Sequence, residues 1–274
     1  MNMLEQIIET KKAEINERKT LYPTKLLERS NCFEAPVVSL KNYVTRPDKS
    51  GIIAEIKRRS PSRGIINNYI SVEQTAIGYM QAGASALSVL TDQQYFGGAN
   101  EDLQLARKYN YCPILRKDFT IDEYQIIEAR SLGADAILLI AAILSPAQLV
   151  RFTRLAHSLQ MEVLLEVHTK AEINALETEA DLIGINNRNL GSFQTSVQHS
   201  LELIEWLPRQ AVKISESGID APETAAMLKR HGFDGFLIGE PFMRHSRPEL
   251  ACANFIRQYQ SILHETQNLR QYQS

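Results

Sequence analysis

The sequence predicts a single (β/α)8 TIM barrel over residues 51–274, with an N-terminal helical extension over residues 1–50. Three observations favour this fold. Short apolar runs alternate with helical stretches eight times, the runs are too apolar for one face to meet water, and 274 residues suit one barrel domain. A doubly wound open sheet would show the same alternation and is the alternative.

The first expected element is a helix over residues 3–19. Leu4, Ile7, Ile8 and Ile15 stand at helical spacing with charged residues between them, which gives the segment one apolar stripe. From there to about residue 50 the chain is punctuated by prolines, and we expect it to be irregular.

The eight expected strands follow in order. They are residues 52–57, 85–90, 113–118, 136–141, 162–167, 182–186, 212–217 and 235–239. The helical stretches between them begin near Ser, Asp or Pro, and several end at Gly, as helix termini commonly do. Strands this apolar, alternating with helices, predict parallel pairing covered on both faces and closed into a barrel.

Composition argues against several classes of protein. A formal net charge of −2 gives no reason to expect nucleic acid or an anionic membrane as a partner. The three cysteines lack CxxC spacing, so we expect reduced thiols and neither a disulfide framework nor a metal cluster. No apolar run approaches the roughly 20 residues of a membrane span, and the charged N-terminus is unlike a signal peptide. We expect a cytoplasmic protein, and a monomer by default.

Polar groups collect where the expected strands end, which is the side of such a barrel that carries the active site. Glu55 and Lys57 end the first strand, Lys117 the third and Glu166 the fifth. Taken alone, the first two could form a structural ion pair, and Lys117 could lie in a solvated loop. Closing the barrel brings all four around one axis, where a packed core would not tolerate them. We therefore interpret them as an acid–base site.

Other kinds of chemistry leave no mark on the sequence. No activated Ser or Cys nucleophile, Walker GxxxxGK[ST] loop or GxGxxG fingerprint is evident, so neither ATP nor NAD is indicated. His168 follows the fifth strand, and no second histidine stands at metal-ligand spacing from it. We interpret it as a surface or packing histidine.

The last two strand ends have a different character. Ser217, Gly218 and Gly239 put backbone N–H groups where they can face outward, and Glu240 can open a short helix. This arrangement is a frequent phosphate site in the fold, and Lys57 and Ser60 could close it from the first strand. The Glu240 carboxylate is unfavourable beside a phosphate, so we expect its side chain to point away. The alternative is that the glycines only permit tight turns.

Five motifs in order resemble the indole-3-glycerol-phosphate synthase family over nearly the whole chain. They are EIKRRSPS at 55–62, RKDFTIDEYQ at 116–125, LLEVHT at 164–169, GINNRNL at 184–190 and SESGI at 215–219. The resemblance implies a (β/α)8 barrel whose N-terminal extension packs on the mouth and helps to cover the substrate. It also implies that the enzyme needs no metal and no cofactor.

The resemblance implies a reaction on a small phosphorylated substrate. In it, 1-(2-carboxyphenylamino)-1-deoxyribulose 5-phosphate closes its ring and loses CO2 and water to give indole-3-glycerol phosphate. By motif match, Lys117 looks like the acid that protonates the substrate carbonyl, a step that suits a lysine of lowered pKa. Glu166 and Glu55 look like the carboxylates of the dehydration step. Lys57 looks like a group that binds the substrate carboxylate or acts as an acid.

The remaining matches concern binding. Asn186 and Arg188 match polar residues that position the substrate, and Phe96 and Phe119 match the apolar walls that hold its aromatic ring. Ser217, Gly218 and Gly239 match the phosphate cradle. Two places depart from the family pattern, Arg59 and the pair Ala99-Asn100, and neither departure removes a catalytic group.

Two other functions would use the same phosphate loops. A barrel like phosphoribosylanthranilate isomerase would use a Cys and Asp pair, whereas the strand ends here carry Lys and Glu. A barrel that binds a phosphorylated ligand without turning it over would need only the cradle and the apolar walls. It would have no use for the four charged groups Glu55, Lys57, Lys117 and Glu166.

Overall fold

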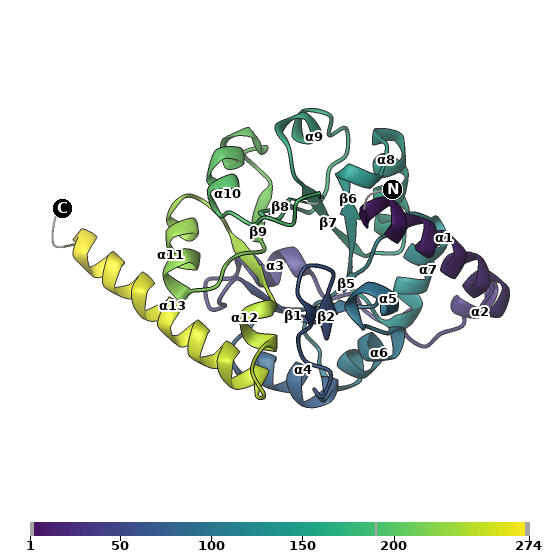
Figure 1. The fold of residues 1–274 in the computed structure, drawn as a ribbon, viewed down its shortest axis with the longest axis horizontal. Helices are drawn as coiled ribbons and strands as arrows, with labels where there is room; N and C mark the ends of the chain where they lie inside the picture. Colours follow the sequence, from purple (N-terminus) through teal and green to yellow (C-terminus); the bar gives the residue numbers. More distant parts are fainter. Residues whose placement is uncertain (1–2, 190, 272–274) are drawn as a thin grey trace.

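A computed structural model describes residues 3–189 and 191–271, without the side chains of 266–271. Residues 1–2 and 272–274, at the ends of the two predicted segments, and Leu190, at the end of the GINNRNL motif, lie outside the described residues. Eight parallel strands close into a barrel in the order β1-β10-β9-β8-β7-β6-β5-β4, with helices around it (Figure 1). The predicted barrel is confirmed, and the open sheet is wrong.

The strands agree with the predicted ranges to within a residue at each end. They are β1 Ile52–Ile56, β4 Ala86–Leu90, β5 Ile114–Lys117, β6 Ala136–Ile140, β7 Glu162–Val167, β8 Leu182–Asn186, β9 Val212–Glu216 and β10 Gly235–Ile238. One antiparallel hairpin was not predicted. It consists of β2 (Arg59–Ser60) and β3 (Gly64–Ile65), and it lies in the loop that follows β1.

Helices alternate with the strands of the barrel. They are α4 Val72–Gln81, α5 Gln93–Phe96, α6 Asn100–Tyr109, α7 Glu123–Leu132, η1 Ala141–Ile143, α8 Pro146–Ser158, α9 Lys170–Asn174, α10 Gln198–Leu203, η2 Ile204–Trp206, α11 Pro222–Arg230, α12 Glu240–Met243 and α13 Pro248–Gln271. Several begin at a side chain that accepts a hydrogen bond from the first turn. Ser71 caps α4 in this way, and Asp122 and Ser145 form capping boxes for α7 and α8.

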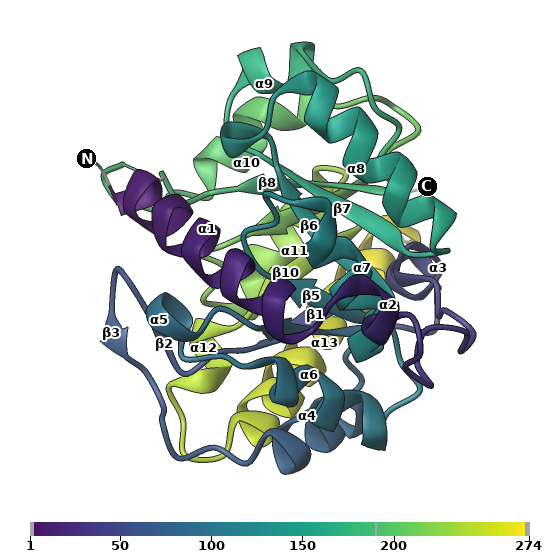
Figure 2. The ribbon, with the colours of Figure 1, turned by 90° about the vertical axis from the view of Figure 1, so that its right-hand side faces the viewer.

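Three helices precede the barrel: α1 (Met3–Leu21), α2 (Thr24–Leu27) and α3 (Leu40–Thr45). The first is the helix predicted over residues 3–19, and it lies diagonally across the barrel in Figure 2. The expectation of an irregular chain up to residue 50 is wrong, because α2 and α3 are helical. Both are too short to show an apolar period in the sequence.

The core has two layers, as the alternation of strand side chains requires. Along β1, Ile52, Ala54 and Ile56 pack against the helices, whereas Ile53 points into the barrel. Leu40 and Val44 of α3 join the interior cluster. Val44 lies beside Gly51 and Gly235, where β1 and β10 begin, so α3 closes that end of the barrel and leaves the opposite end for a site.

Candidate active site

One pocket at the carboxyl ends of the strands collects all the predicted site residues. These are Glu55, Lys57, Ser60, Phe96, Lys117, Phe119, Glu166, Asn186, Arg188, Ser217, Gly218, Gly239 and Glu240. Met3, Leu4 and Ile7 of α1 line the same pocket, so the N-terminal helix supplies part of its apolar wall.

The strand period explains why charged groups meet there. Each is the next inward-facing position after an interior core residue on the same strand. The pairs are Ile53 and Glu55 on β1, Leu115 and Lys117 on β5, Leu164 and Glu166 on β7, and Ile214 and Glu216 on β9. On these four strands, the inward-facing position after an interior apolar residue therefore places one titratable side chain in the pocket.

Lys117 lies at the centre of this group. Its Nζ donates hydrogen bonds of 2.9 Å to Glu166 Oε2 and of 2.9 Å to Glu216 Oε2. Burial acts to lower the pKa of Lys117, but Glu166, Glu216 and Glu55 outweigh it and raise the pKa. The expectation of a lysine with a lowered pKa is therefore wrong, because two carboxylates stabilise its charged form.

The two glutamates that flank Lys117 differ from one another. Burial raises the pKa of Glu166, but Lys117 and then His168 outweigh burial and lower it to about 2. Burial raises the pKa of Glu216 to about 7; Lys117 opposes this rise, and the neighbouring Glu166 adds to it. The Oε1 of Glu216 is also buried without a hydrogen-bond partner. The site thus holds one carboxylate that stays ionised and one that titrates near neutral pH.

Glu216 lies within the SESGI motif but was not assigned to the site from the sequence alone. The available signal was a carboxylate closing the apolar run of β9, the same signal that identified Glu166. Gly184 on the neighbouring strand leaves room for Glu216, since a Cβ on this glycine would lie 2.1 Å from Glu216 Oε1. The sequence alone does not show this contact, which depends on the pairing of β8 with β9.

His168 was interpreted as a surface or packing histidine, and the surface alternative is wrong. Its side chain is buried, and its Nε2 lies 3.3 Å from Glu166 Oε1. Burial acts to lower the pKa of His168, but Glu172 and Glu166 outweigh burial and raise it. The surrounding carboxylates therefore favour the protonated form of His168 beside the carboxylate that already faces Lys117.

Glu55 and Lys57 form an ion pair, with Lys57 Nζ 2.6 Å from Glu55 Oε1. Glu55 is buried, and Lys57 is mostly so. Gly239 packs directly against this pair, because a Cβ there would lie 2.6 Å from Glu55 Oε1. Both residues line the pocket. The ion pair therefore does not rule out a role in the chemistry.

Two aromatic rings form one side of the pocket. Phe96, at the end of α5, and Phe119, just after β5, have ring centroids 6.0 Å apart at an angle of 43°. Both line the pocket together with the apolar residues of α1. A flat aromatic ligand fits against such a wall.

Polar residues from two segments, the end of β8 with its loop and the hairpin after β1, also line the pocket. Asn186 Oδ1 accepts a hydrogen bond of 3.0 Å from the backbone N–H of Arg188. Arg188 Nη1 donates to Ser62 Oγ at 3.0 Å, which ties the loop after β8 to the hairpin after β1. Ser60 lies in the same hairpin, with its Oγ 3.4 Å from that of Ser62.

The end of β9 turns sharply beside the predicted phosphate site. Ser217 and Gly218 both have left-handed backbones, with φ of 68° and 70°. A Cβ on Gly218 would lie 2.5 Å from the methyl of Thr195. Glu240 opens the short helix α12, and its carboxylate faces Arg63 Nε at 3.0 Å. The negative charge of Glu240 is thus partly offset.

The two departures from the family pattern are accommodated locally. Arg59 Nη2 donates to the backbone carbonyl of Gln93. Asn100 Oδ1 accepts a hydrogen bond of 3.1 Å from Arg116 Nη2. Neither side chain lines the pocket.

Within residues 3–189 and 191–271, no three His, Cys, Asp or Glu side chains are grouped so as to hold a metal ion. In the same residues, no helix is long and apolar enough to cross a membrane.

Comparison with known proteins identifies the family. The family described as "Indole-3-glycerol phosphate synthase" matches residues 4–255. The chain belongs to the indole-3-glycerol phosphate synthase family. A protein of that name from Bacteroides thetaiotaomicron is 45% identical over 260 residues, which cover 94% of this chain and 99% of that protein. Another, from Bordetella pertussis, is 46% identical over 209 residues, which cover 76% and 80%.

Solved structures share the fold of this indole-3-glycerol phosphate synthase family member at low sequence identity. The alpha subunit of tryptophan synthase from Legionella pneumophila is 13% identical with a TM-score of 0.57, covering 78% of this chain and 92% of that one. The 3-hexulose-6-phosphate synthase of Salmonella typhimurium is 11% identical with a TM-score of 0.59, covering 76% and 99%. Family membership makes the protein a carboxy-lyase of tryptophan biosynthesis that acts on a small phosphorylated substrate.

Proposed function

We propose that the chain converts 1-(2-carboxyphenylamino)-1-deoxyribulose 5-phosphate into indole-3-glycerol phosphate by lysine and glutamate acid–base catalysis. The observation that carries this proposal is the position of Lys117, which lies between two buried glutamates in a pocket walled by two aromatic rings. A site for binding alone would not need two buried carboxylates in contact with one lysine.

Lys117 acts as the general acid in ring closure. The ring carbon that bears the carboxylate attacks the substrate carbonyl, and the carbonyl oxygen takes a proton from the ammonium group. The raised pKa of Lys117 keeps this ammonium group protonated at neutral pH. Glu216, whose pKa lies near 7, then returns a proton to the lysine.

The same ring carbon then loses CO2, and the electrons of the broken bond restore the aromaticity of the ring. Dehydration follows, and it needs a base for the N–H proton and an acid for the departing hydroxyl. Glu166, whose pKa is lowered to about 2, is ionised and serves as the base. Lys57, whose ammonium group is held by Glu55, gives a proton to the hydroxyl, which departs as water. Before CO2 is lost, the same ammonium group lies beside the substrate carboxylate.

The rest of the pocket binds the substrate. Phe96 and Phe119 hold the aromatic ring, and Asn186 and Arg188 position the sugar chain. The phosphate cradle is formed by Ser217, Gly218 and Gly239, together with Ser60 and the backbone at Glu240. The site uses no metal and no cofactor.

The decisive experiment follows the fluorescence of the indole product after substrate is added to chelator-treated protein. We expect the signal to rise with the natural chain and Lys117→Ala to lose about 10²–10⁴-fold in kcat, the usual contribution of a general acid. Lys213→Ala is the matched control, because this lysine lies near the start of β9, at the opposite end of the barrel. A flat trace with saturable binding would replace the catalytic proposal with that of a binding barrel.

Four expectations stay predictions: the division of the chain at residues 50 and 51, a monomeric state, a cytoplasmic location, and the absence of nucleic acid as a partner.

A further inference from the structure

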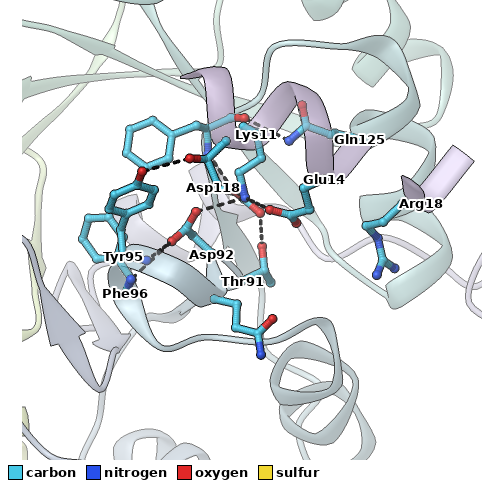
Figure 3. Close-up of polar contacts among 12 residues, drawn as sticks. Lys11, Glu14, Arg18, Thr91, Asp92, Tyr95, Phe96, Asp118 and Gln125 are labelled. Carbon is cyan, nitrogen blue, oxygen red and sulfur yellow. Dashed lines mark hydrogen bonds and ion pairs between the residues drawn. The ribbon is translucent and has the colours of Figure 1, made fainter. Parts of the chain in front are cut away.

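A buried lysine on α1 lies outside the pocket and has no role in the reaction proposed above. Lys11 is 1% exposed and does not line the pocket, although Ile7, one turn earlier on the same helix face, does. Its Nζ lies 2.7 Å from Glu14 Oε2, 3.0 Å from Asp92 Oδ2 and 3.0 Å from Asp118 Oδ1 (Figure 3). Two of these three carboxylates come from the loops after β4 and β5.

Asp92 has a second contact that leads to the pocket. Its Oδ1 accepts hydrogen bonds from the backbone N–H groups of Tyr95 at 2.7 Å and of Phe96 at 3.2 Å, which caps α5 (Figure 3). Thr10 Oγ1 lies 3.0 Å from the hydroxyl of Tyr95, which adds a second tie between α1 and the same helix. The position of the Phe96 ring therefore depends on the carboxylate that Lys11 holds.

Asp118 leads to the other side of the aromatic wall. Its Oδ1 accepts a hydrogen bond of 2.8 Å from the backbone N–H of Phe119, and its Oδ2 accepts one from Thr91 Oγ1. Lys11 thus contacts the carboxylates that fix the backbone of Phe96 and of Phe119.

The balance of charge shows that this arrangement depends on Lys11. Burial acts to lower the pKa of Lys11, but Asp118, Asp92 and Glu14 outweigh burial and raise it. Apart from Lys11, Asp118 has Arg116 as a cation, with its Nη2 at 3.5 Å. Without the ammonium group, two buried carboxylates beside the pocket lose their shared counter-charge, and such a loss costs more than the pair contributed.

We propose that Lys11 is a positioning residue that couples α1 to the loops after β4 and β5 and so sets the aromatic wall formed by Phe96 and Phe119. This proposal rests on the proposed function, in which these two rings hold the aromatic ring of the substrate. Lys11 acts on substrate affinity and leaves the proton chemistry of Lys117 unchanged.

The test compares two lysine substitutions on adjacent positions of α1. Lys11→Met keeps much of the side-chain length and removes the buried charge. Lys12→Met makes the same chemical change at a side chain that is 57% exposed and pairs with Glu9. We expect Lys11→Met to raise KM about tenfold or more with kcat within about twofold of the natural chain. We expect Lys12→Met to change neither constant.

A helix contact that only stabilises the fold predicts a different result. It would lower the melting temperature and the fraction of active protein, so that apparent kcat would fall at an unchanged KM. That result, or constants equal to those of Lys12→Met, would overturn the proposal. If the natural chain and Lys12→Met show no turnover, the proposed function fails, which is a separate outcome.

Asp92→Asn covers the case in which Lys11→Met does not fold. Asparagine is a good helix N-cap, so α5 keeps its first-turn hydrogen bonds while the charge facing Lys11 is lost. We expect this variant also to raise KM severalfold with little change in kcat. An unchanged KM would contradict the coupling.

Discussion

Glu166 and Glu216 accept hydrogen bonds from the same ammonium group of Lys117, yet their protonation differs. Glu166 also lies beside His168, and the two cations outweigh the cost of its burial. Glu216 has one oxygen without a hydrogen-bond partner, and burial dominates there. One lysine between two unlike carboxylates can give up a proton and regain it, which the proposed ring closure requires.

The raised pKa of Glu216 predicts how stability varies with pH. With a pKa of about 7 in the folded chain, against an ordinary value of 4.5, the folded state binds more protons between these limits than the unfolded state does. Its contribution to the free energy of unfolding is therefore fully present below about pH 4.5. It is lost as pH rises through 7, and amounts to roughly 3 kcal/mol.

Urea unfolding of Glu216→Gln at several pH values between 4.5 and 8 checks this prediction. We expect its stability relative to the natural chain to rise with pH over this window, since glutamine does not ionise. Glu223→Gln, at an exposed position of α11, is the control and should follow the natural chain. Parallel curves for the natural chain and Glu216→Gln would contradict the assigned pKa.

At the scale of elements, four strands deliver one titratable side chain each, and loops that follow the strands add further residues to the pocket. The loop after β9 depends on a left-handed turn at Ser217 and Gly218. This conformation suits glycine, and at Gly218 a side chain would also collide with Thr195. The backbone at this turn is thus tightly specified beside the proposed phosphate cradle.

Gly218→Ala tests whether this turn serves binding. We expect KM to rise about tenfold or more, because strain and the contact with Thr195 displace the backbone N–H groups from the phosphate. The control is Gly232→Ala, at another positive φ of 101°, where the nearest atom to a new Cβ is 3.7 Å away. Both variants should lose roughly 1–2 kcal/mol of stability from backbone strain. Steady-state assays of both variants check this prediction. Equal KM values would contradict the assignment of the phosphate cradle to the loop after β9.

At the scale of the whole molecule, the two ends of the barrel have separate roles. Leu40 and Val44 of α3 close the end where strands begin, whereas the opposite end is open and lined by titratable groups. In this fold the first end serves stability and the second serves function.

The same substitution on two rings should separate these roles. Phe236 on β10 is fully buried against Tyr259 of α13, so Phe236→Ala should cost about 3–5 kcal/mol of stability. Phe96 is half-buried in the pocket wall, so Phe96→Ala should cost less stability and mainly raise KM. Thermal unfolding and steady-state kinetics of both variants check this contrast. A KM effect as large in Phe236→Ala would show that the ends are not independent.

Strand period and strand-end chemistry made much of this protein predictable. Alternation of apolar runs and helices was enough for a parallel sheet covered on both faces. Eight repeats, and the family motifs, favoured closure into a barrel over an open sheet. The positions of Glu55, Lys117 and Glu166 at the ends of such runs were enough to bring them into one pocket, because parallel strands present their carboxyl ends together.

The sequence by itself therefore determined the fold, the end of the barrel that bears the site and the residue types in it. Only the tertiary structure decided which charges touch. The raised pKa of Lys117, the place of Glu216 and the buried contact of Lys11 with Asp92 and Asp118 all depend on separations of a few ångströms between groups far apart in the chain. Electrostatic effects vary steeply with distance and burial, and neither can be read from the spacing of residues along the chain.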